Sequence, residues 1–248
     1  MKIIISPAKR MKMNNDFLEP ASLPVFLDKA KELLKELQKK SIDELQAIFQ
    51  TNRRLTLENY HRYQQFDFYS NLTPAVLAYD GIQYTYMAAD VFTKNEFEYL
   101  HEHLYILSGL YGVLKALDGI TPYRLEMQAK MKLRDSRNLY DFWGDSIYNE
   151  IFKHKEIVLN LTSEEYKRAI YRYLRPEDRF VSVFFYEPHH GILTEKAVYA
   201  KMARGAMVRY LAVNQIDGIE QVKQFNELGF GYRPELSSED KLVFIRKE

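Results

Sequence analysis

Residues 103–127 read HLYILSGLYGVLKALDGITPYRLEM and contain the turn that most constrains the fold. Gly109 and Gly112 enclose two residues, so the backbone can adopt positive φ angles there and approach another segment closely. If a helix begins at Val113, the free N–H groups of its first turn favour an anion such as a phosphate. The alternative is a plain corner between two helices, in which a glycine ends the first one. Spacing alone leaves both interpretations open.

Upstream of this turn the sequence predicts mostly helices. Residues 3–5 form a short apolar run that is typical of a buried strand, and Lys9 follows it closely after Ser6 and Pro7. Apolar residues recur at helical spacing over residues 22–40, and two capping boxes begin at Ser41 and Thr93. Helices are therefore predicted over residues 22–40, 53–66 and 94–107, with shorter ones beginning at 42 and near 74.

Downstream of the turn, strands and helices alternate. Residues 156–161, 179–187 and 241–247 are rich in β-branched and aromatic side chains, which favour strands. Helices are predicted over residues 139–154, 163–173, 194–213 and 219–228. This order predicts a mixed α/β (α+β) fold, a single domain over residues 1–248 with a mixed sheet flanked by helices.

Composition excludes several classes of protein. The chain has 35 basic and 34 acidic residues, so its net charge of +1 gives no global argument for nucleic acid or membrane binding. The absence of cysteine excludes disulfides, thiolate chemistry and iron–sulfur clusters. No apolar run approaches the roughly 20 residues that cross a bilayer. We expect a cytoplasmic protein with no membrane association and no obligate protein partner.

Basic residues are concentrated in three runs, at 123–137, 167–175 and 196–209. If the fold brings the runs to one face, they form a basic hollow; the alternative is three separate solvated faces. Lys201 and Arg204 share one face of a predicted helix, and Gly205 beside them serves either close approach of an anion or tight packing of a second helix.

Chemical motifs are scarce. Ser108 is a candidate nucleophile and Glu126 a candidate acid or base, but the chain has no Gly-x-Ser-x-Gly elbow, P-loop or dinucleotide fingerprint. The Glu-x-x-His spacing at Glu58 and at Glu98 resembles that of di-iron sites, yet no further carboxylates can be assigned. We predict no cofactor and no metal site.

Several separated motifs resemble those of the bacterial YaaA peroxide-stress family. They are ISPAK at 5–9, LSGLYGVL at 107–114, PYRLEM at 122–127, NLYDFWGD at 138–145, Asn160 and Leu161 with Ser163, Glu165 and Tyr166, and ARG at 203–205. Met202 departs from the pattern, because the family usually has a second lysine there.

The resemblance implies a protein that protects cells from hydrogen peroxide by limiting damage from free iron, and that binds DNA. It also implies a helix-hairpin-helix element, which the turn at Gly109 and Gly112 would form, and a basic cleft. We expect sequence-tolerant contacts to DNA phosphates. The residues expected to make them are Lys9, Gly109, Gly112, Arg124, Lys201 and Arg204.

A second hypothesis is a small-molecule enzyme that acts on a nucleotide-like or phosphorylated substrate in the same cleft. A segment as dense in functional groups as YRLEM, with Arg124 and Glu126 near Ser108, exceeds what phosphate contacts require. In a third hypothesis the protein sequesters iron directly.

Overall fold

The computed structural model describes residues 1–14, 17–133 and 136–247, and its centre is a mixed sheet. Five neighbouring strands of this sheet run parallel, in the spatial order β12 (Lys241–Arg246), β9 (Phe180–His189), β8 (Val158–Leu161), β1 (Lys2–Ile5) and β5 (Leu104–Ser108). Antiparallel strands β11 (Phe230–Tyr232) and β6 (Gly112–Lys115) form the two edges, and β10 (Ile192–Thr194) pairs with the end of β9. The α/β class predicted from the sequence is confirmed.

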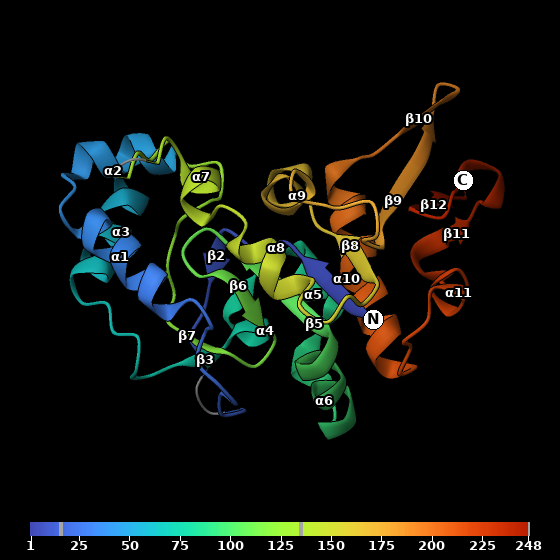
Figure 1. The fold of residues 1–248 in the computed structure, drawn as a ribbon, viewed down its shortest axis with the longest axis horizontal. Coiled ribbons are helices and arrows are strands. Elements are labelled where there is room, and N and C mark those ends of the chain that lie inside the picture. Colours follow the sequence, from blue (N-terminus) through green and yellow to red (C-terminus); the bar gives the residue numbers. More distant parts are fainter. Residues whose placement is uncertain (15–16, 134–135, 248) are drawn as a thin grey trace.

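The central strands of the sheet are covered on both faces. Every residue of β1, β5 and β8 is buried, as is typical of parallel strands between two layers of helices. Helices α8 (Ser146–Ile151) and α9 (Glu164–Tyr171) contact each other in front of the sheet in Figure 1. Behind it, α10 (Ala197–Val213) packs against α5 (Ile82–Met87) and α6 (Lys94–His103).

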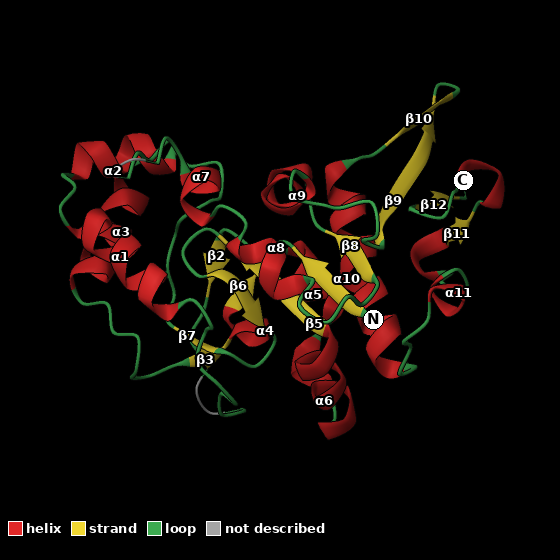
Figure 2. Cartoon of the chain, viewed as in Figure 1, coloured by secondary structure: helices red, strands yellow, loops and turns green. Residues whose placement is uncertain are grey.

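A separate group of helices lies at one end of the molecule (Figure 2). It contains α1 (Leu27–Gln38), α2 (Ile42–Phe49) and α3 (Arg53–Gln64), with α7 (Leu139–Trp143) beside them. Helix α1 buries Leu33, Leu34 and Leu37 on its apolar side. Both predicted capping boxes, at Ser41 and Thr93, are present. One cluster of buried apolar side chains includes residues of this group and of the sheet.

Short elements connect these parts. Strand β2 (Arg10–Met11) pairs with β4 (Tyr79–Asp80), and β3 (Thr73–Pro74) pairs with β7 (Gly119–Ile120). Helix α4 (Ala75–Ala78) lies between β3 and β4, and α11 (Ile219–Val222) follows α10. Short 3₁₀ helices span Ala89–Val91, Glu227–Gly229 and Pro234–Leu236. No helix in the described part of the chain has the length and hydropathy needed to cross a bilayer.

The turn at Gly109 and Gly112 joins two strands, so the helix-hairpin-helix predicted there is wrong. Helix α6 ends at His103, and residues 104–108 continue as β5, which pairs with β1 on one side and with β6 on the other. Gly112 has a φ of +73°, which the turn between β5 and β6 requires. The apolar residues at 104–107 are buried in the sheet, and pairing with β1 gives them a strand conformation.

Other predicted helices differ at their ends. The helix predicted over residues 139–154 is divided into α7 and α8, because Gly144 between them has a φ of +53°. The helix predicted over 219–228 ends as α11 at Val222. The helix predicted over 194–213 begins only at Ala197, after β10.

Candidate functional site

A cavity of about 510 Å³ lies where β1 and β8 end. The chain leaves these adjacent strands in opposite directions, since β1 leads to β5 on one side and β8 to β9 on the other. Counted along the chain, the five parallel strands stand in the order 2-1-3-4-5, and in such sheets ligands bind outside the carboxyl ends of the strands at this switch point. The position of the cavity therefore identifies it as the candidate site.

Five segments far apart in the sequence line the cavity. They are the loop after β1, the start of α5, the YRLE part of the PYRLEM motif, the start of α9 and the middle of α10. Ser6 joins two of them across the switch point: its Oγ accepts a hydrogen bond from the Ser163 N–H at 2.9 Å and donates one to Ser163 Oγ at 3.2 Å. The lining residues are Ser6, Pro7, Ala8, Lys9, Arg10, Asp80, Gly81, Ile82, Gln83, Tyr84, Tyr123, Arg124, Leu125, Glu126, Ser163, Glu165, Tyr166, Lys201 and Arg204.

Four of the six predicted site residues meet at this cavity. Lys9, Arg124, Lys201 and Arg204 all line it, although they come from three distant parts of the chain. The three basic runs do not converge as a whole: the run at 167–175 contributes no lining residue, and Arg134 lies outside the described residues. Convergence is thus limited to individual cations.

Gly109 and Gly112 are buried and do not line the cavity. A Cβ built on Gly109 would stand 2.2 Å from the carbonyl oxygen of Leu125, and one on Gly112 would stand 2.7 Å from the ring of Trp143. The Trp143 Nε1–H also donates a hydrogen bond to the Gly109 carbonyl at 3.1 Å. The glycine turn therefore supports the YRLEM segment from behind and positions Arg124 and Glu126.

Helix α3 positions the same segment from the other side. The hydroxyl of Tyr63, which is fully buried, donates a hydrogen bond to the Arg124 carbonyl and accepts one from the Arg124 N–H at 3.2 Å. Both the N–H and the carbonyl of the Arg124 backbone are thereby hydrogen-bonded. The backbone of Arg124 is held in place, and only its side chain is available to a ligand.

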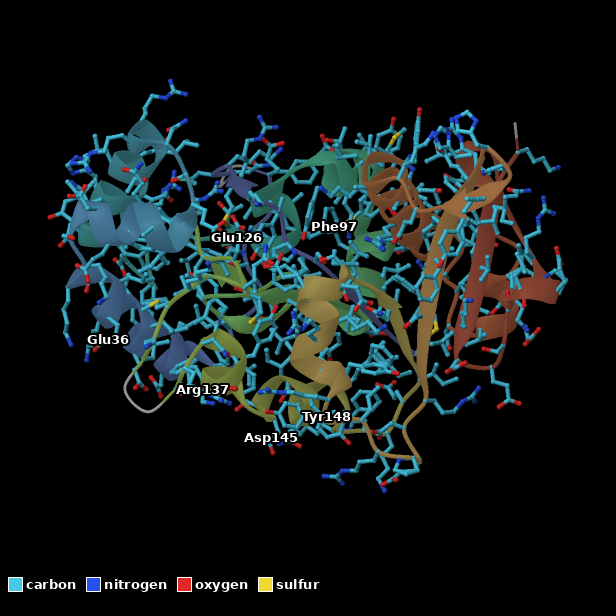
Figure 3. The ribbon with its side chains drawn as sticks, turned by 90° about the horizontal axis from the view of Figure 1, so that it is seen from above. Glu36, Phe97, Glu126, Arg137, Asp145 and Tyr148 are labelled. Carbon is cyan, nitrogen blue, oxygen red and sulfur yellow. The ribbon has the colours of Figure 1, made fainter. Side chains whose placement is uncertain are left out.

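Carboxylates pair with three of the four cations. Glu126 receives Lys9 Nζ at 2.9 Å and Arg124 Nη2 at 3.0 Å, and Glu195 receives Arg204 Nη2 at 2.7 Å. Lys201 is exposed and makes no ion pair within the described chain. Figure 3 shows Glu126 well inside the outline of the molecule, away from its two ends. The cavity is therefore a site of mixed charge rather than an open basic surface.

Two arginines at the cavity keep unpaired hydrogen-bond donors. Within the described chain, the buried Nε atoms of Arg124 and Arg204 have no partner. The Arg204 side chain is only 11% exposed, and burial lowers the pKa of its guanidinium below the ordinary value, although Glu195 partly offsets this. An additional anion would satisfy these donors and stabilise the buried charge.

Glu165, at the start of α9, is a further carboxyl group of the cavity, to which sequence reasoning gave no role. Its Oε1 accepts a hydrogen bond from the Gln128 N–H at 3.2 Å. Burial raises the pKa of this carboxyl, the Gln128 N–H lowers it, and Glu126 raises it again. Glu165 belongs to one of the motifs that resemble the family, and this motif was the only feature of the sequence that pointed to it. The burial and hydrogen bond that raise or lower its pKa arise only in the folded chain.

Ser108 does not reach the cavity. It is fully buried, with its Oγ 2.6 Å from the Tyr123 hydroxyl and accepting the Tyr111 N–H at 2.9 Å. Tyr123 also bonds Tyr79, hydroxyl to hydroxyl, at 2.8 Å, and burial raises the pKa of Tyr123 to about 12. Ser108, the candidate nucleophile, is thus a buried hydrogen-bonding group that supports Tyr123 in the wall of the cavity.

Gly205 allows α10 to contact α5 closely. A Cβ there would stand 2.0 Å from the carbonyl oxygen of Gln83, so the helix-packing interpretation of this glycine is supported. The contact places Gln83 and Arg204 in the same wall of the cavity. No group of three or more His, Cys, Asp or Glu side chains suited to a metal occurs among the described residues.

Comparison with known proteins gives consistent matches along the chain. A family model described as peroxide stress protein YaaA matches residues 1–236, which include every segment that lines the cavity. A UPF0246 protein of Agathobacter rectalis is 48% identical over 247 residues, covering 100% of this chain and 99% of the relative. UPF0246 proteins of Desulfitobacterium hafniense (50% identity, covering 99% and 98%) and Ligilactobacillus salivarius (48%, covering 99% and 100%) are similarly close.

Proposed function

Because this chain belongs to the YaaA peroxide stress protein family, we propose that it protects cells from hydrogen peroxide and that it does so by binding a small anionic molecule in the cavity between β1 and β8. The observation that carries the proposal is the pair of buried Nε donors on Arg124 and Arg204, which have no partner among the described residues and belong to a cavity that Lys201 also lines. Guanidinium groups with free donors are suited to phosphate and carboxylate.

The size of the cavity supports a small ligand. Ligand sites in proteins are typically about 300–1,000 Å³, and this one measures about 510 Å³. Such a volume accommodates a metabolite but not a nucleic-acid duplex. The ion pair with Glu126 orients the largely buried Arg124 side chain before a ligand arrives, which reduces the entropy cost of binding.

Two carboxyl groups in different surroundings give the site the means for proton transfer. Glu126 is paired with two cations, whereas Glu165 accepts a backbone N–H and has a raised pKa. Carboxyl groups whose surroundings differ in this way serve as acid and base in many enzymes. This supports the enzyme hypothesis, with a phosphorylated or nucleotide-like substrate.

Calorimetric titration of the purified protein with inorganic phosphate tests anion binding. Arg124→Gln should weaken binding roughly ten- to a hundred-fold, because a hydrogen bond to a charged group contributes about 1.5–3 kcal/mol. Arg137→Gln is the matched control, since Arg137 is an exposed arginine paired with Asp141 and does not line the cavity. Absence of binding, or equal affinity of the two variants, would contradict the proposal.

The role in peroxide defence needs a test in cells. A strain that lacks this protein should regain survival in hydrogen peroxide when it expresses the wild type or Arg137→Gln, and not when it expresses Arg124→Gln at the same level. The family resemblance further implies that protection acts on free iron. In that case a cell-permeant iron chelator should remove the difference between the strains.

DNA binding is a second candidate, favoured by the exposed cations Lys9, Arg10 and Lys201 among the residues of the cavity. A duplex would contact these side chains from outside, through its phosphates. Affinity for a random duplex should then fall steeply with salt, because phosphate contacts release counterions. An affinity that is the same at low and physiological salt, or a Lys201→Ala, Arg204→Ala double variant that binds like the wild type, would exclude this function.

A further inference from the structure

Gln83 places an unused amide donor at the cavity. The residue is 7% exposed, and its Nε2 has no hydrogen-bond partner in the described part of the chain. The close contact of its carbonyl with Gly205 fixes the residue between α5 and α10, in the same wall as Arg204. A buried donor left without a partner is unfavourable, so a group that accepts from it would stabilise the complex.

Three tyrosines line the same cavity with their hydroxyl groups already engaged. The Tyr84 hydroxyl donates to the Ser6 carbonyl at 3.0 Å, and the Tyr123 hydroxyl bonds Ser108 and Tyr79. The Tyr166 hydroxyl interacts with the backbone of Met127. These side chains therefore offer the cavity their ring carbons rather than hydrogen-bonding groups. With Pro7, Ala8, Ile82 and Leu125 they give the cavity an apolar part.

The site thus combines three recognition elements within about 510 Å³: cations, the amide donor of Gln83 and aromatic rings. Inorganic phosphate would use only the cations, and a sugar phosphate adds hydroxyl groups that accept hydrogen bonds but has no planar ring to pack against the tyrosines. A planar heterocycle has faces that pack against aromatic rings and ring nitrogens or carbonyls that accept from an amide. A ligand that uses all three elements carries both an anionic group and a heterocycle.

We propose that the ligand is a nucleoside monophosphate or a close chemical equivalent. Arg124, Arg204 and Lys201 hold its phosphate, Gln83 donates to an acceptor on the base, and the rings of Tyr84, Tyr123 and Tyr166 pack against the base. This inference rests on the anion site proposed above and specifies the rest of the ligand.

The test is calorimetric titration with the four ribonucleoside 5′-monophosphates, ribose 5-phosphate and inorganic phosphate. At least one nucleotide should bind tenfold or more tightly than ribose 5-phosphate. Gln83→Leu, which removes the donor at similar volume, should reduce that preference to threefold or less and leave the affinity for ribose 5-phosphate unchanged. Gln83→Met is a second variant in case leucine disturbs folding, and the exposed Gln224→Leu is the control.

The outcomes separate the two proposals. If ribose 5-phosphate binds as tightly as every nucleotide, or if both Gln83 variants keep the wild-type preference, the nucleotide inference is wrong while the anion site stands. If none of these phosphate compounds binds, both proposals are wrong.

Discussion

The backbone of Gly109 lies against the backbone of Leu125, so closely that a Cβ on the glycine would stand 2.2 Å from the Leu125 carbonyl oxygen. Gly109 belongs to the turn between β5 and β6, and Leu125 lies between Arg124 and Glu126. This contact, together with the hydrogen bond between Ser108 of β5 and Tyr123, connects the sheet directly to the segment that carries Arg124 and Glu126.

Gly109→Ala should destabilise the protein and disturb the site. The atoms in the way are backbone atoms, which cannot move aside as a flexible side chain can, and overpacking of this kind typically costs about 1–3 kcal/mol. Urea unfolding should show the loss. The control is Gly231→Ala, because a Cβ at Gly231 meets nothing within 4 Å. Equal denaturation midpoints for the two variants would mean that the Gly109 contact is not tight in solution.

Gly205→Ala tests the packing of α5 against α10 through the sign of its effect. In an open helix, replacing an interior glycine by alanine stabilises by about 1 kcal/mol. Here the new Cβ would stand 2.0 Å from the Gln83 carbonyl oxygen, so we expect net destabilisation. Phosphate affinity should fall as well, because the helices that hold Gln83 and Arg204 must separate. A gain in the free energy of unfolding would show that the helices adjust without cost.

Glu165 should make stability depend on pH. Burial raises the pKa of its carboxyl in the folded protein above the ordinary value of 4.5, so folding favours the protonated form. The free energy of unfolding therefore falls as pH rises from about 4.5 through the folded pKa, and the loss is complete above it. Glu165→Gln removes this loss.

The variant Glu165→Gln should consequently gain stability relative to wild type as pH increases from 4.5 to 8, with little gain at the acidic end. Urea unfolding of both proteins across this range measures the difference. Glu164→Gln, one residue away and exposed, should show no comparable gain. A constant difference between wild type and Glu165→Gln at all pH values would contradict the assigned cause of the pKa shift.

Sequence patterns anticipated the elements that depend on local signals. The apolar run at 3–5 and the β-branched runs at 156–161, 179–187 and 241–247 all form strands of the main sheet. The capping boxes at Ser41 and Thr93 begin helices because their hydrogen bonds join residues only three apart. The sequence also singled out Lys9, Arg124, Lys201 and Arg204, which line one cavity, and their role in binding stays a prediction.

Residues 104–107 show where local signals were insufficient. A short apolar run has no periodicity that separates a buried strand from the end of a helix. Its conformation is determined by pairing with β1, about a hundred positions earlier in the chain. With β5 assigned to a helix, the turn at Gly109 was necessarily placed between helices as well.

The electrostatic character of the cavity also could not be predicted. Glu195 pairs with Arg204 because β10 and the start of α10 bring them together, and Glu165 faces the YRLEM segment only in the folded chain. Gln83 carried no sequence signal, since a glutamine acquires significance only when burial leaves its amide without a partner. The sequence alone indicated the cations of the cavity. It did not indicate that carboxylates pair with them or that Gln83 adds an amide donor.

The Glu195 carboxylate pairs with the Arg204 guanidinium as an anionic ligand would. The carboxylate and a bound anion should therefore compete for Arg204. The two side chains are 34% and 11% exposed and lie 2.7 Å apart, so removing the carboxylate leaves a poorly solvated guanidinium without its partner. Glu195→Gln should therefore lower the melting temperature of the ligand-free protein and increase the stabilisation produced by inorganic phosphate, which replaces the lost charge. Thermal unfolding with increasing phosphate measures both effects. Glu220→Gln is the matched control, because it breaks an ion pair of similar length with Lys223 on exposed α11, away from the cavity. If phosphate stabilises Glu195→Gln no more than wild type, Arg204 does not contact the anion.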